Sequence, residues 1–517
     1  MNKYKYLLLT VVAILWLAAP SVSAQSIAYI PMDDRPVNLD YVVDTAKAAG
    51  VDIMAPPAAL LGSRGEAGDP DGLWEWLFAH ALMADEVVVS ADSLLYGNLV
   101  DSRTHNIPLP VIENRLNNFA QLKALKPTMS IYVYSTIMRT PKSGEGDEEP
   151  SYYKVYGPSI FKITALRDQA EIRGLSRKEQ NELGSLLDKV PQAILSDWYA
   201  RREKNFIANK HLIDYAKNDT FTYFLMGRDD CAPYSQSHME SRQLAIETTE
   251  LPLNRYASFP GADEIGMLMV ARAVNNAAGR NPTVRVLFAP GAGPDTVPSY
   301  EDVAVGQTIN AHILAAGGIP LNSEQADLIL TVNTPEDGVT READSTFNRG
   351  QFRAAPVALA ADVAREVAAG HRLAVADIAF ANGADNTLMS ELRRRGLLFK
   401  LESYSGWNTA SNAIGYAIGQ GMLASDMAPM DKNRLLAVRF LDDWAYQANV
   451  RDAVGREMLY PLGGNWFCLD GVTLRLTAET DQRLRAFAAA NFSAYPLNTV
   501  KLSFPWNRMF EVKFTFS

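Results

Sequence analysis

Cysteine and histidine are scarce in this chain of 517 residues, which contains two Cys and six His. The His residues stand far apart, and neither an HExxH motif nor a paired-cysteine motif is present. Because zinc sites draw their ligands from closely spaced His and Cys, these absences argue against a His-rich zinc site. Cys231 and Cys468 could form a disulfide in an oxidising compartment, and the sequence leaves both the bridged and the free state open.

Several binding and catalytic motifs are absent as well. The sequence contains no P-loop and no GxSxG motif, and the glycine-rich run 289–293 lacks the spacing of a dinucleotide-binding loop. The formal net charge is −10 and no basic cluster is visible, which argues against nucleic acid as a partner because phosphate binding needs clustered Lys and Arg. An uncharged or cationic small molecule or oligosaccharide suits this charge better.

No hydrophobic run after the first residues is long enough to span a membrane. Residues 1–24 combine Lys3 and Lys5 with an apolar stretch and the small residues Val22-Ser23-Ala24, which predicts a secretory signal peptide. We therefore expect a periplasmic or secreted protein with no membrane contact after cleavage.

Short β-branched and aromatic runs alternate with longer helical stretches over most of the chain. This rhythm is typical of an α/β protein with parallel sheets. The clearest predicted strands are residues 26–30, 86–90, 130–134, 221–226, 284–289, 328–332, 373–379 and 398–401, with a weaker strand at 51–54. Helices are predicted over 265–277 and 305–316.

A turn-rich connector near residue 280 divides the chain into two predicted parts. Residues 25–280 form an α/β domain that is either barrel-like or doubly wound, with a charged helical insertion at about 146–211. Residues 281–517 form a second, flavodoxin-like α/β lobe, and its last residues, 497–517, alternate with aromatics as strands do.

Polar clusters follow the predicted strands, at the ends where ligands bind in parallel sheets. The residues that we expect to line a pocket there are Asp33, Asp34, Arg35, Asn38, Asp92, Arg103 and Arg139. In the second lobe, Trp407 and Asn408 combine a ring for stacking with an amide, as sugar sites do. Turns, helix caps and a core position for Trp407 are the alternative interpretations.

Three carboxylates are candidates for catalysis. Asp229 and Asp230 directly follow the apolar strand 221–226, and adjacent carboxylates can divide acid and base roles when their environments separate their pKa values. Glu264 heads the predicted helix 265–277, where a carboxylate also favours the helix dipole.

Four motifs carry a resemblance that spans nearly the whole mature chain: DDRPVN at 33–38, SLLYG at 93–97, FPGADE at 259–264 and GWNTA at 406–410. Together they resemble a bacterial family catalogued as domain of unknown function four-one-two-seven. The pair Asp229-Asp230 is also similar to the adjacent aspartates of substrate-assisted N-acetylhexosaminidases, in which one orients the acetamido group and the next protonates the leaving oxygen.

These observations favour an exported glycoside hydrolase that uses Asp229, Asp230 and Glu264 as acid, base or nucleophile. One alternative is a hydrolase or isomerase in which Asp33, Asp34, Asp92 and Asp229 bind a divalent cation, the one cofactor that the sequence suggests. The other is a periplasmic sugar-binding protein whose two lobes close on a ligand without turnover.

Overall fold

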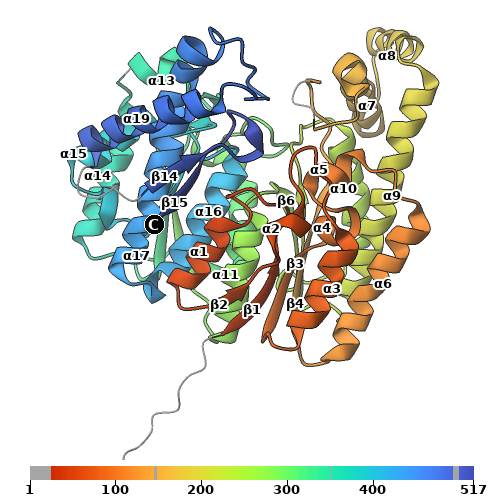
Figure 1. The fold of residues 1–517 in the computed structure, drawn as a ribbon, viewed down its shortest axis with the longest axis horizontal. Coiled ribbons are helices and arrows are strands. Elements are labelled where there is room, and N and C mark those ends of the chain that lie inside the picture. Colours follow the sequence, from red (N-terminus) through yellow and green to blue (C-terminus); the bar gives the residue numbers. More distant parts are fainter. Residues whose placement is uncertain (1–24, 145–147, 351, 493–499, 517) are drawn as a thin grey trace, which may run out of the picture.

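The computed structural model describes residues 25–144, 148–350, 352–492 and 500–516. The predicted signal peptide lies outside these residues. In the described part, two parallel sheets stand side by side with helices around and between them, which confirms the α/β prediction (Figure 1). No helix among these residues is long and apolar enough to cross a membrane.

The first sheet is open and doubly wound, so the barrel alternative is wrong. Its strands are β1 Ser26–Ile30, β2 Asp52–Met54, β3 Glu86–Ser90, β4 Ser130–Ile137, β5 Tyr223–Arg228 and β6 Tyr256–Pro260. They run parallel in the order β2-β1-β3-β4-β5-β6. Strands buried on both faces are rich in consecutive apolar residues, and β3, in which every residue is buried, has Val87-Val88-Val89 at its centre.

Helices cover both faces of this sheet. They are α1 Asp40–Ala48, α2 Ala58–Leu61, α3 Pro70–Ala81, α4 Ala91–Tyr96, α5 Leu99–Thr104, α6 Leu109–Leu125, α7 Tyr153–Arg173, α8 Arg177–Lys189, α9 Gln192–Lys217, α10 Gln236–Glu247 and α11 Ile265–Ala277. The predicted charged insertion becomes α7, α8 and the first half of α9, which project from the sheet (Figure 1). Ile160, Ile163 and Trp198 form a separate small core there, while Leu212 anchors the second half of α9 in the main core.

The second sheet has five strands: β7 Thr283–Phe288, β8 Ile319–Pro320, β9 Leu328–Asn333, β11 Leu373–Asp377 and β13 Ser403–Ser405. Their order is β13-β11-β9-β7-β8. Counted from β7, this is the flavodoxin order 2-1-3-4-5, which confirms the predicted character of the lobe. Short β10 Arg341–Glu342 and β12 Phe380–Ala381 pair beside it, and β14 Val500–Ser503 and β15 Lys513–Phe516 form an antiparallel hairpin.

The helices of the second lobe are α12 Val305–Ala315, α13 Thr346–Gly350, α14 Ala354–Ala368, α15 Asn386–Arg394, α16 Ala410–Leu423, α17 Pro429–Arg439, α18 Arg451–Val454 and α19 Thr473–Asn491. A π-helical stretch, Phe440–Val450, joins α17 to α18, and a second, Gly455–Leu459, follows α18. Short 3-10 turns occupy Gly293–Asp295, Leu398–Lys400, Ala424–Asp426 and Pro505–Asn507.

Two sequence-based assignments need correction, and the structure decides the state of the two cysteines, which the sequence left open. The predicted strand 398–401 is a 3-10 turn whose Leu398 and Leu401 fill the core, because a short apolar run suits any buried segment. Strand β6 was missed because its Ser258 and Pro260 weaken the pattern, which an edge strand tolerates. Cys231 is buried and Cys468 is exposed, and both are free thiols.

Helices α11 and α16 lie between the two sheets and join them through one core (Figure 1). Tyr29 of the first sheet and Leu330 of the second belong to this same buried cluster. Gly419 of α16 allows the close approach, since a Cβ there would lie 2.5 Å from Cγ of Met267 on α11.

We expect Gly419→Ala to lower the free energy of unfolding by about 1–3 kcal/mol, the usual range for overpacking. Gly184→Ala in the exposed helix α8 is the matched control, because a Cβ there meets nothing within 4 Å. The control should raise stability by up to about 1 kcal/mol through helix propensity. Urea unfolding followed by circular dichroism measures both changes, and equal changes would contradict the close α11–α16 contact.

Candidate functional site

A cavity of about 230 Å³ lies where the carboxyl ends of the two sheets meet. In the first domain its lining comes from α5 and from the loops that follow β1, β4, β5 and β6. In the second lobe it comes from the loops that follow β7, β12 and β13, from the first turn of α16 and from Phe467. The segment between β14 and β15 completes it. The charged residues of the lining are Arg35, Arg103, Arg139, Glu148, Asp229, Asp230, Asp263, Glu301 and Arg508.

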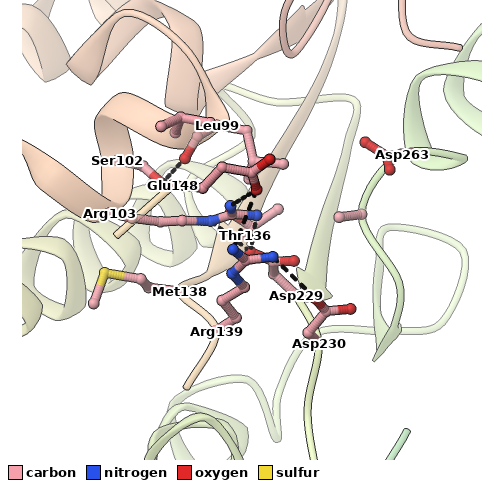
Figure 2. A network of polar contacts seen from close by, with 12 residues as sticks. Leu99, Ser102, Arg103, Thr136, Met138, Arg139, Glu148, Asp229, Asp230 and Asp263 are labelled. Atoms are coloured by element: carbon pink, nitrogen blue, oxygen red, sulfur yellow. Dashed lines mark hydrogen bonds and ion pairs between the residues drawn. The ribbon is translucent and has the colours of Figure 1, made fainter. Parts of the chain in front are cut away.

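Asp229 and Arg103 form a buried ion pair on one wall (Figure 2). Arg103 reaches in from α5 and donates from Nε and Nη2 to Oδ2 of Asp229, at 3.1 and 2.7 Å. The two side chains are 3% and 6% exposed. Charge-assisted hydrogen bonds in a dry site are strong, so the pair fixes the orientation of both groups.

Asp230 is the more open carboxylate of the adjacent pair. Its side chain is 31% exposed and bonds to Nη1 of Arg139 at 3.1 Å (Figure 2). Burial, with Asp229 beside it, raises the pKa of Asp230 to about 6. Its φ of 26° is unusual for a residue other than glycine, and such strain often marks functional positions.

A second buried network surrounds Arg35. Its guanidinium group bonds to Asp33 at 2.7 Å and to Asp263 at 2.5 Å, and Asn38 donates to both carboxylates. Burial raises the pKa of Asp263 although Arg35 opposes the shift. The ring of Trp506 lies 4.9 Å from the Arg35 guanidinium carbon.

Glu301 brings a protonated carboxyl to the cavity from the loop after β7. It accepts a hydrogen bond from the backbone N–H of Ser411 in the first turn of α16, at 2.7 Å. Burial raises its pKa to about 8, more than the hydrogen bonds from Ser411 lower it. At neutral pH the cavity therefore holds a carboxylic acid next to ionised carboxylates.

Six residues singled out in the sequence line the cavity: Arg35, Arg103, Arg139, Asp229, Asp230 and Asn408. Three other predicted residues do not line the cavity but form hydrogen bonds with residues that do. Asp33 and Asn38 hold Arg35 and Asp263, and Asp34 accepts a hydrogen bond from Nε1 of Trp506 at 2.6 Å.

The remaining three predicted residues are not in the lining. Asp92 is buried behind the wall, where it accepts hydrogen bonds from N and Oγ1 of Thr136, and burial raises its pKa to about 7. Glu264 points away from the cavity to His312, whose Nε2 lies 3.7 Å from Oε1. Trp407 is a core residue that packs against Phe510.

Sequence reasoning passed over five lining residues that the structure brings in: Glu148, Asp263, Glu301, Trp506 and Arg508. Asp263 carried a signal, since it precedes Glu264 at the end of a strand, but sequence does not tell which of two neighbours faces a cavity. Glu148 and Glu301 lie about ten residues beyond the ends of β4 and β7, and Trp506 and Arg508 lie between β14 and β15, so none of the four directly follows a predicted strand.

The four aspartates of the proposed cation site do not come together. Among the described residues, no group of three or more His, Cys, Asp and Glu is arranged to hold a metal ion. Asp92 accepts a hydrogen bond from Thr136. Asp33 and Asp229 form ion pairs with Arg35 and Arg103, respectively.

The raised pKa of Glu301 predicts a dependence of stability on pH. The unfolded chain ionises this group near 4.5 and the folded chain near 8, so its contribution makes the free energy of unfolding fall as pH rises from about 5 to 8. We expect Glu301→Gln to show a shallower fall than the wild type in urea unfolding at pH 5, 6, 7 and 8. The exposed Glu203→Gln is the control. Parallel curves for wild type and Glu301→Gln would contradict the assignment.

Comparison with known proteins agrees with the resemblance carried by the four motifs. The sequence model of one protein family matches residues 27–515. No curated protein matches the chain. The chain therefore belongs to the family described as Protein of unknown function (DUF4127).

Proposed function

We propose that the protein is an exported carbohydrate-active enzyme, a glycoside hydrolase that works by general acid and base catalysis in this cavity. One observation carries the proposal: Glu301, with a pKa of about 8, and Asp230, with a pKa of about 6, line the same cavity. At neutral pH Glu301 is therefore protonated and Asp230 is ionised. Two carboxyl groups with pKa values pushed apart are what glycoside hydrolysis requires.

In this mechanism Glu301 protonates the oxygen of the leaving group. Asp230 either removes a proton from the attacking water or attacks the anomeric carbon itself, and the anomer released distinguishes these routes. Arg139 holds Asp230 in place, and Arg103 holds the neighbouring Asp229.

The lining also offers groups that bind sugars. Asn382, Asn408 and Asn412 contribute amides, and Trp506 contributes an indole ring. Trp506 therefore takes the stacking role that the sequence suggested for Trp407. Export is proposed from the signal-like residues 1–24 alone.

The two alternatives receive less support. The cation-dependent hydrolase lacks a ligand cluster among the described residues. The binding protein requires lobes that move apart, whereas here α11 and α16 share one continuous buried core with both sheets.

We expect Asp230→Asn and Glu301→Gln each to lower kcat by about 10²–10⁴-fold, the usual contribution of an acid or base. A panel of nitrophenyl glycosides first identifies a substrate that the wild type hydrolyses. The variants are then compared on it after circular dichroism has shown that they fold.

Glu203→Gln is the control, because this exposed carboxyl on α9 lies outside the cavity lining and its loss should leave activity unchanged. Wild-type turnover in both Asp230→Asn and Glu301→Gln would refute the assignment. Tight sugar binding without turnover in the wild type would favour the binding-protein alternative.

A further inference from the structure

Three arginines converge on a single carboxylate in the cavity, that of Glu148. Arg103 Nη1 and Arg139 Nη2 donate to its Oε2, at 3.0 and 3.2 Å, and Arg508 donates to its Oε1 (Figure 2 shows Arg103 and Arg139). In the proposed mechanism Arg103 and Arg139 act through Asp229 and Asp230, whereas Glu148 and Arg508 have no role.

Each arginine keeps another carboxylate partner that would hold it in place without Glu148. Arg103 is bound to Asp229 at 2.7 Å, Arg139 to Glu149 at 2.7 Å, and Arg508 to Glu511 at 2.9 Å. The guanidinium groups are therefore oriented by partners other than Glu148. Oriented donors bind an anion without the cost of ordering them first.

The position of the Glu148 carboxylate strongly favours negative charge. Burial acts to raise its pKa, but Arg508, Arg139 and Arg103 outweigh burial and bring the pKa well below its usual range. The negative net charge of the whole chain therefore does not determine the electrostatic potential at Glu148, because nearby charged groups dominate the potential in a buried site.

The cavity is also small for a ligand site. Its 230 Å³ lies below the range of about 300–1,000 Å³ that is common for small-molecule pockets. The side chain of Glu148 belongs to its lining, so its rotation away from the arginines would enlarge the space beside Asp230 and Arg139.

We propose that Arg103, Arg139 and Arg508 form a carboxylate-binding subsite, which the side chain of Glu148 fills in this structure. The ligand is an acidic sugar such as a uronate, and its carboxylate displaces that of Glu148. The sugar part of this inference rests on the proposed function, whereas the carboxylate part does not. A planar carboxylate is favoured because the three arginines already share the two oxygens of one.

The test is calorimetric titration of D-glucuronate and D-glucose into the wild type, Glu148→Ala and Glu149→Ala. Removal of Glu148 abolishes competition for the arginines, so glucuronate should bind Glu148→Ala at least tenfold more tightly than the wild type, with glucose unchanged. Glu149 is the matched control, since it is the adjacent carboxylate and bonds to Arg139 without bridging the three arginines. An equal gain in Glu149→Ala would reveal a general charge effect and overturn the subsite.

A second measurement separates the two parts of the inference and requires no turnover. Acetate, compared with chloride at equal ionic strength, should raise the Tm of Glu148→Ala more than that of the wild type. If acetate raises the Tm of Glu148→Ala more than that of the wild type, but glucuronate binds the variant no more tightly, the carboxylate subsite stands and the uronate is refuted. If neither ligand distinguishes the variant from the wild type, the subsite is refuted, whatever the outcome of the glycosidase assays.

Discussion

The guanidinium group of Arg35 is buried between the carboxylates of Asp33 and Asp263, and the shape of the cavity depends on this contact. It fastens the loop after β1 to the loop after β6, although three strands lie between them in the sheet order. Tyr416 of α16 donates to the backbone oxygen of Asp263, which ties the second lobe to the same point. Removing one member of a buried ion pair commonly costs about 3–5 kcal/mol, so these loops are held firmly.

Counted from the first strand of each, the two sheets share the strand order 2-1-3-4-5, and the first sheet adds a sixth strand. Helices α11 and α16 pack between them. Each sheet gathers polar loops at the carboxyl ends of its strands, and the cavity forms where the two sets meet. One lobe supplies the Asp229–Asp230 pair, and the other supplies Glu301. Because Asp230 and Glu301 come from different lobes, their surroundings differ, and so do their pKa values.

The sequence predicted most of the fold because strands buried on both faces are plain apolar runs and α11 begins and ends where its pattern does. It also predicted the strand-end residues of the cavity, such as Arg103 and Asp229. It could not decide between Asp263 and Glu264, since the direction of each side chain depends on the turn before α11. Glu148 and Arg508 escaped prediction because only the folded chain brings them beside the strand ends.

The indole of Trp506 and the carboxylate of Asp34 are joined by a hydrogen bond that spans 472 positions of the chain. This contact closes a loop of nearly the whole chain, and the closure requires that both ends of the chain have been synthesised. The sheets can assemble beforehand, but the cavity acquires Trp506 and Arg508 only when this closure occurs. A nascent chain that has not yet reached residue 506 is thus without a finished pocket, so ligand binding is delayed until synthesis has passed that point.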